Sequence, residues 1–186
     1  GQTDPNTVYR FLKTLSDMSV DIHKADAEFK IGEIVYPKGS YVVFASQTAR
    51  NFLISLLSRT FYRDNLWVRT PDGVPMMNYD FATQTMAEFK GVDIIEAMEI
   101  PDGSFSKVEP VPPVGGLDGK SKLGYLIDCR VNDSFKAVNK LCKAGLEVNR
   151  YTESIKVGDE QYPAGMWHVS GDEKKLEKVA EETHLQ

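Results

Sequence analysis

The side chains in this sequence that could bind a metal or act as nucleophiles are three histidines and two cysteines. The histidines are His23, His168 and His184, and none belongs to an H-x-x-E or H-E-x-x-H pattern. Cys129 and Cys142 lack the paired spacing of a zinc site and lie in apolar patterns typical of buried side chains. The sequence also has no nucleophile-elbow or phosphate-loop motif. We therefore expect no catalytic residue and no metal ligand within this chain.

One polar and aromatic segment, residues 78–86, is denser in functional side chains than its surroundings. Its simplest interpretation is a helix that Asp80 caps and Gly91 ends, because aspartate accepts hydrogen bonds from the first free amides of a helix. The alternative is that Tyr79 and Asp80 contact a ligand. They would form an enzyme site only if they converged with His168 within hydrogen-bond reach.

Two tryptophans are candidates for stacking on a ligand. Trp67 lies in an irregular stretch, with Tyr62 nearby, and Trp167 lies in a predicted strand. His168 follows Trp167, and since neighbouring strand residues point to opposite faces, one of the two faces the core and the other does not. These side chains favour a second interpretation of the chain, a self-contained module that binds a peptide or a glycan in a groove between the two copies of the internal repeat described below.

The charge and composition exclude several classes of protein. With 22 basic and 27 acidic residues the net charge is −5, so a nucleic acid or an anionic membrane surface is an unfavourable partner. A hydrophobic content of 41% is typical of a folded chain, and no apolar stretch approaches the roughly 18 residues of a membrane span. We expect neither nucleic acid nor membrane as a partner.

The sequence contains an internal repeat. Residues 8–45 align without a gap with residues 134–171, at an offset of 126. The identical positions are Leu15/Leu141, Lys30/Lys156, Gly32/Gly158, Tyr36/Tyr162, Pro37/Pro163, Gly39/Gly165 and Val43/Val169. The matched turn residues indicate two copies of one supersecondary unit.

Each copy is predicted to form a helix, three strands and a second helix. Apolar residues recur at helical spacing in the first part and then alternate with polar ones, as in half-buried strands. The shared Tyr-Pro-x-Gly sequence, at 36–39 and 162–165, predicts a type I turn, with proline at its second position and glycine at its fourth. The closing helices are expected at about 47–59 and 172–183.

The expected fold class is α+β, with mixed sheets on which the helices pack. A strand at 125–130 precedes the second copy, and a strand, a helix and a strand at that spacing predict a parallel pair joined by a right-handed crossover. The corresponding strand of the first copy would lie upstream of Gly1, so we expect the chain to be a piece of a larger protein. We expect a first unit at 1–100, a Pro/Gly-rich linker or surface loop at 101–122 and a second unit at 123–186.

A series of short motifs covers most of the chain. The motifs are Tyr-Pro-Lys-Gly-Ser-Tyr-Val-Val (36–43), Gln47 to Phe52 with Leu56-Leu57, Tyr-Asp-Phe-Ala-Thr (79–83), Met86 with Gly91-Val92, Gly-Tyr-Leu-Ile-Asp (124–128), Ala-Val-Asn-Lys-Leu (137–141) and Tyr-Pro-Ala-Gly (162–165). In this order they resemble the region that follows the catalytic domain in large bacterial zinc-carboxypeptidase-like proteins. The resemblance rests on the order of the motifs more than on any one of them. The sequence departs from the family at Phe89-Lys90-Gly91, where a methionine is expected before the glycine.

The resemblance implies a place in a larger protein rather than an activity. Those peptidases hold zinc through H-x-x-E and a distant histidine in an upstream domain, and this chain has no such set. It is therefore expected to be a non-catalytic accessory region of a secreted or periplasmic protein, without a cofactor of its own. Its implied partner is the upstream catalytic domain, and a peptide or glycan ligand is the alternative.

Overall fold

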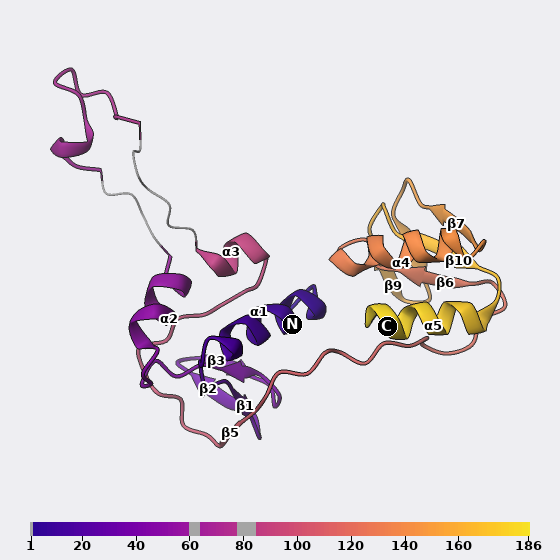
Figure 1. The fold of residues 1–186 in the computed structure, drawn as a ribbon, viewed down its shortest axis with the longest axis horizontal. Coiled ribbons are helices and arrows are strands. Elements are labelled where there is room, and N and C mark those ends of the chain that lie inside the picture. The colour runs from indigo at the N-terminus through magenta and orange to yellow at the C-terminus, as the bar shows by residue number, and fades with distance from the viewer. Residues whose placement is uncertain (1, 60–63, 78–84) are drawn as a thin grey trace. The chain divides into compact units, whose positions relative to one another are not determined.

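The computed structural model describes residues 2–59, 64–77 and 85–186, and it is an α+β fold of helices and small antiparallel sheets (Figure 1). The chain divides into two compact units. Unit 1 contains residues 1–14 and 110–186, and unit 2 contains residues 15–109. The expected boundaries were 1–100, 101–122 and 123–186. One dividing point of the observed units falls within the first helix, α1 (Pro5–Asp17), and the other falls at Glu109 and Pro110.

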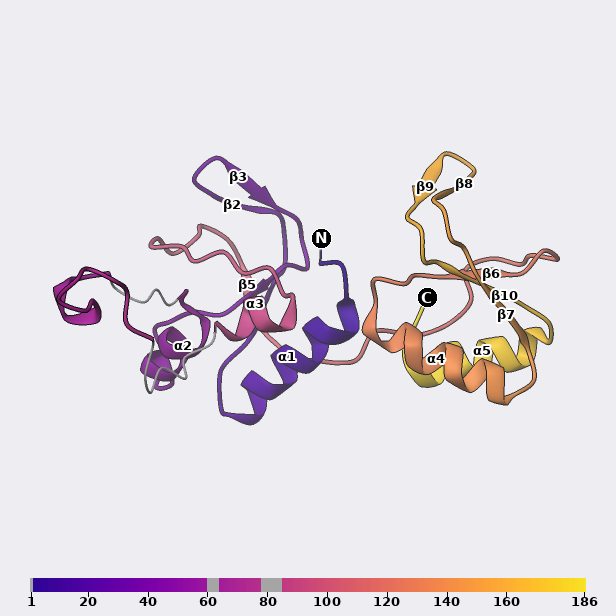
Figure 2. The same ribbon diagram turned by 90° about the horizontal axis from the view of Figure 1, so that it is seen from above.

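Unit 1 is a three-stranded antiparallel sheet with two helices packed on it (Figure 2). The strand order is β6, β10, β7, and the helices α4 and α5 lie side by side. Its core consists of Ala137, Leu141, Val169, Leu176 and Val179. The elements in chain order are β6 (Tyr125–Ile127), α4 (Asn132–Lys143), β7 (Glu147–Arg150), β8 (Ile155–Val157), β9 (Glu160–Tyr162), β10 (Trp167–Ser170) and α5 (Glu173–Thr183).

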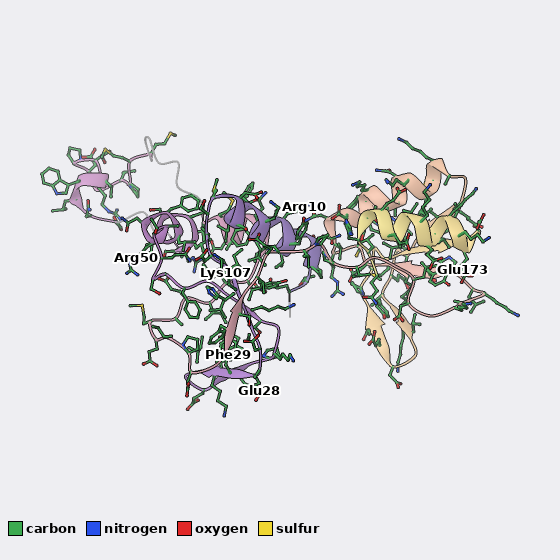
Figure 3. The ribbon with its side chains drawn as sticks, turned by 60° about the horizontal axis from the view of Figure 1, so that its bottom comes forward. Arg10, Glu28, Phe29, Arg50, Lys107 and Glu173 are labelled. Carbon is green, nitrogen blue, oxygen red and sulfur yellow. The ribbon has the colours of Figure 1, made fainter. Side chains whose placement is uncertain are left out.

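Unit 2 also contains a three-stranded sheet, in the order β4, β1, β5, of which β4 and β1 correspond to β10 and β7. A chain of ring contacts joins its strands. Phe29 (Figure 3) stacks on Tyr36 and meets Phe105 edge to face, each at 5.1 Å between centroids, and Phe105 meets Phe44 at 5.5 Å. The elements are the end of α1, β1 (His23–Ala25), β2 (Phe29–Ile31), β3 (Ile34–Tyr36), β4 (Tyr41–Val42), α2 (Arg50–Leu57), the 3-10 turn η1 (Leu66–Val68), α3 (Met86–Lys90) and β5 (Phe105–Lys107).

The repeat predicted from the sequence is confirmed by the strand register. His23 pairs with Val42, and Asn149 pairs with His168, at the same offset of 126. The offset also relates the β2–β3 hairpin to the β8–β9 hairpin, pair by pair. Both first helices end alike, because the amide of Val20 donates to Leu15 and that of Leu146 donates to Leu141, each at 3.1 Å. The residues before these amides, Ser19 and Gly145, both have a left-handed backbone, with φ of 64° and 77°.

Three details of the predicted unit are wrong. Each copy has four strands rather than three. The additional strand, β3 or β9, ends at the tyrosine of the Tyr-Pro-x-Gly sequence. The turn lies one residue further along. The amide of Ser40 donates to Pro37, and the positive φ of Gly39, 89°, is at the third position, which makes the turn type II rather than type I.

The third error concerns the sheets, which are antiparallel in the described parts of the chain and not mixed. β6 and β7 do run in the same direction on either side of α4. They are not neighbours, because β10 lies between them and pairs antiparallel with both. A strand–helix–strand pattern in sequence is thus compatible with a third strand inserted between its two strands.

The segment expected to be a linker, residues 101–122, has structured parts. β5 lies within it and pairs with β1, so this stretch completes the sheet of unit 2. Further along, the amide of Gly116 donates to the carbonyl of Leu185 at 2.8 Å, which fixes the chain beside the end of α5. The high proline and glycine content of this segment therefore indicates irregular backbone, although parts of the segment are packed against the rest of the chain.

Candidate functional site

Trp167 is a packed side chain of unit 1. Its exposed fraction is 6%, and its ring meets Phe135 edge to face at 4.9 Å between centroids. The guanidinium carbon of Arg150 lies 5.5 Å from the indole centroid, in cation–π contact. The same pair recurs in unit 2, where the ammonium of Lys24 lies 5.4 Å from the ring of Tyr41. The duplicated contact indicates that Trp167 supports the fold of its unit.

His168 faces the other side of the same strand and is half-buried. Its Nε2 lies 2.7 Å from the carbonyl oxygen of Leu123. Because a carbonyl only accepts, Nε2 must carry the proton and donate it. This bond anchors the segment before β6 to β10. With Nε2 engaged in this way, His168 holds backbone in place and does not present that nitrogen to a substrate.

Trp67 is the sequence-predicted site residue that lies at the surface, with 86% of its area exposed. It belongs to residues 64–77, which we call the Trp67 hairpin. Leu66, Val74, Met76 and Met77 on the same hairpin are also exposed, by 88%, 59%, 44% and 92%. Large apolar side chains gathered at a surface are typical of a site of interaction.

Hydrogen bonds within the Trp67 hairpin hold these side chains in place. The amides of Thr70 and Met76 donate to Val74 and Val68, both at 2.8 Å. Arg69 bonds both carboxylate oxygens of Asp64, at 2.5 and 2.7 Å, and donates to the carbonyl of Gly73 at 2.6 Å. These hydrogen bonds from Arg69 hold the pKa of Asp64 below its usual value. The hairpin thus has an internal framework that does not depend on an apolar core.

Tyr79 and Asp80, like Tyr62, lie outside the described residues. The helix that Asp80 was predicted to cap begins later than expected, since α3 starts at Met86 and Thr85 is at its N-cap position. Its end is as expected, because Gly91 has a left-handed conformation with a φ of 66°. Trp67 and Trp167 belong to different units. The predicted convergence of Tyr79 and Asp80 with His168 therefore falls outside the described residues.

No metal site is formed in residues 2–59, 64–77 and 85–186, where no three His, Cys, Asp or Glu side chains are placed to hold an ion. His23 is half-buried and packs edge to face on Phe44 at 5.0 Å. Both cysteines are free, and Cys142 is exposed, so the expectation that it is buried is wrong. It lies on the outer face of α4.

A buried polar network in unit 1 was not anticipated from the sequence. The carboxylate of Asp4 accepts hydrogen bonds from the amide and hydroxyl of Thr7, at 2.9 and 2.7 Å, which caps α1. It also accepts from the amide and side-chain nitrogen of Asn132, both at 3.0 Å. Asp4 therefore accepts hydrogen bonds from the first turn of α1 and from the first turn of α4. Next to it, the guanidinium of Arg10 pairs with the buried Asp133 at 2.5 Å.

The signal for this network was present only in part. Asp4-Pro5 and Asn132-Asp133 each stand where a helix begins, and the sequence predicts a polar cap for its own helix at each place. In the structure the residue before α4, Val131, makes no side-chain cap, so the free amide of Asn132 finds its acceptor in a residue 128 positions away. A contact over this sequence distance has no periodic pattern that could predict it.

The Asp4 network predicts a stability change in acid. Burial raises the pKa of Asp4, but the hydrogen bonds from Asn132 and Thr7 outweigh it and hold the pKa below the ordinary value of 3.8. The charged form therefore stabilises unit 1 fully above the unfolded-state pKa of about 3.9, and this contribution is lost as the pH falls through the lower folded-state value.

The test compares wild type with Asp4→Asn by urea unfolding between about pH 2 and pH 6. The difference in unfolding free energy is expected to be constant above about pH 5 and to shrink in acid. Subtracting the two curves removes the contribution of carboxylates common to both, such as Asp128 beside Arg130. A difference that does not change with pH would show that the charge on Asp4 contributes nothing.

In comparisons with known proteins, no family model matches the chain, and no curated protein or solved structure matches it. Within the described residues, none of the helices has the length and apolar character needed to cross a membrane.

Proposed function

We propose that this chain is a non-catalytic accessory region of a secreted or periplasmic zinc-carboxypeptidase-like protein, and that it packs against the catalytic domain of that protein. The observation that carries the proposal is the Trp67 hairpin. Its apolar side chains are exposed by up to 92%, while its backbone is held by its own hydrogen bonds. Such a surface is arranged to contact another surface without first ordering itself, which lowers the entropic cost of binding.

The chemistry of the described side chains agrees with a role in packing. Trp167 and His168, which were candidates for a binding site, are engaged in contacts that support unit 1. Any zinc of the parent protein would be held in the upstream domain, as the resemblance implies. The accessory region would then shape access to that domain rather than take part in its reaction.

Oxidative footprinting tests this assignment. We expect Trp67 and Met77 to be oxidised readily in the isolated chain and several-fold more slowly in the parent polypeptide, because docking would cover them. Met98 is the matched control, since it is 95% exposed and lies outside the Trp67 hairpin. Equal oxidation of Trp67 in both samples, with Met98 unchanged, would contradict docking through the hairpin.

The second candidate is a module that binds a peptide or a glycan, and the exposed indole of Trp67 favours it. Aromatic rings of this kind present a flat apolar face on which a sugar ring or a side chain can lie. The same footprinting distinguishes the two. Protection of Trp67 in the isolated chain by a soluble peptidoglycan fragment or a short peptide, without the upstream domain, would favour the binding module.

A further inference from the structure

An apolar hollow lies in unit 2 where the end of α1 meets the start of α2. It is lined by Met18, Ser19, Thr48, Ala49 and Phe52, and its volume is about 570 Å³. Met18 and Phe52 are exposed by 53% and 37%, so the walls are open to a partner. The hollow is a surface depression open to solvent and not an enclosed cavity.

The repeat shows what occupies the equivalent place in unit 1. The offset of 126 relates Met18 to Ala144 (18 + 126 = 144) and Ala49 to Lys175 (49 + 126 = 175). In unit 1 the ammonium of Lys175 donates to the carbonyl of Ala144 at 3.0 Å and so satisfies the end of α4. In unit 2 the corresponding residue, Ala49, has only a methyl group and cannot reach the end of α1.

Charge distinguishes the two helix ends in the same way. The last turn of α4 carries two lysines, Lys140 and Lys143, in addition to Lys175 from α5. The last turn of α1 carries no basic residue. Because the carbonyl end of a helix bears a partial negative charge, the end of α1 is suited to a cation that the chain does not supply from the positions used in unit 1.

We propose that the hollow binds a lysine side chain of a partner polypeptide, together with a neighbouring apolar residue. The lysine stem would lie along Met18 and Phe52, and its ammonium would donate to the carbonyl end of α1, as Lys175 does at the end of α4. The hydroxyls of Ser19 and Thr48 can accept further hydrogen bonds from it. This site is separate in residues from the Trp67 hairpin, so the proposal does not depend on the proposed function.

The test uses the full chain with ¹³C-labelled methionine methyl groups and two short peptides. The probes are acetyl-Leu-Lys-Leu-amide and acetyl-Leu-Glu-Leu-amide, and the signal is the Met18 methyl resonance, assigned with Met18→Leu. We expect a saturable shift with the lysine peptide and at least about tenfold weaker binding of the glutamate peptide, because the helix end repels its charge. Equal binding of both peptides, or no shift of Met18, would overturn the proposal.

Ala49→Lys is the matched variant, since it rebuilds in unit 2 the closure found in unit 1. It is expected to weaken binding of the lysine peptide by about tenfold or more. Because Ala49 is the N-cap of α2, the added positive charge is also expected to lower the melting temperature slightly. Ile34→Lys makes the same change of charge at an exposed position outside the hollow, and it should bind as wild type does. If Ala49→Lys fails to fold, the comparison of the lysine and glutamate peptides on the wild-type chain decides the assignment. Unchanged binding by the folded Ala49→Lys variant would contradict the assignment.

Discussion

Replacing Asp4 with alanine is expected to lower the free energy of unfolding of unit 1 by about 2–4 kcal/mol. Loss of a helix cap alone costs about 1 kcal/mol, and buried donors left without an acceptor cost about 1–3 kcal/mol more. Asp4 accepts from two groups of Thr7 and two of Asn132, and its own exposed fraction is 8%. Its removal therefore weakens the first turns of α1 and α4 at once.

Urea unfolding followed by the fluorescence of Trp167 measures this loss. A Trp67→Phe background leaves Trp167 as the one remaining tryptophan, so the signal reports unit 1. Asp4→Asn is the control, because its amide oxygen can still cap α1 while its amide nitrogen cannot accept from Asn132. We expect it to lose roughly half as much stability as alanine. A loss below about 0.5 kcal/mol for Asp4→Ala would show that water replaces the carboxylate without cost.

Gly115→Ala is expected to destabilise unit 1 by about 3 kcal/mol, although it adds a single methyl group. A Cβ at this position would lie 2.1 Å from the carbonyl oxygen of Ala180 and 2.9 Å from the Cα of Glu181. Both are backbone atoms of α5, so no side-chain rotation can relieve the overlap. The segment 110–116 would have to move away from the helix and lose the hydrogen bond from Gly116 to Leu185.

The neighbouring glycine provides the control. A Cβ at Gly116 meets no atom within 4 Å, and its backbone is outside the left-handed region. Gly116→Ala is therefore expected to be neutral or to stabilise by up to about 1 kcal/mol, through the unfolded state. Thermal unfolding of the two variants side by side gives the answer. Equal melting temperatures would show that residues 110–116 are not packed on α5 in solution.

The repeat could be predicted from the sequence because its evidence is local. Turn glycines, the Tyr-Pro pair and the periodicity of each helix lie within one copy, and the common offset of 126 transfers each of them to the other. The strand pairs His23–Val42 and Asn149–His168 follow from that equivalence. Local patterns specify local elements well, since they depend on few residues close together.

The parts that could not be predicted depend on contacts far apart in sequence. β5 is a three-residue strand within a Pro/Gly-rich stretch, and it is placed by Phe105 packing on Phe29 and Phe44. The position of β10 between β6 and β7 likewise has no sequence signature. For the candidate site, the alternation of side chains along a strand predicted that Trp167 and His168 face opposite sides. It could not predict the hydrogen bond from His168 to the carbonyl of Leu123.

The third strand of each sheet joins a different edge of the duplicated pair. In unit 1, β6 lies beside β10, whereas in unit 2, β5 lies beside β1, the counterpart of β7. The element common to both units is therefore a two-stranded ribbon, and a third strand can pair with either of its edges. That third strand comes from the chain before the ribbon in unit 1 and from the chain after it in unit 2. Such a ribbon tolerates rewiring of its connections. We therefore expect the ribbon to tolerate long insertions at its flanks, a changed order of its elements and circular permutation, without a change in the ribbon itself.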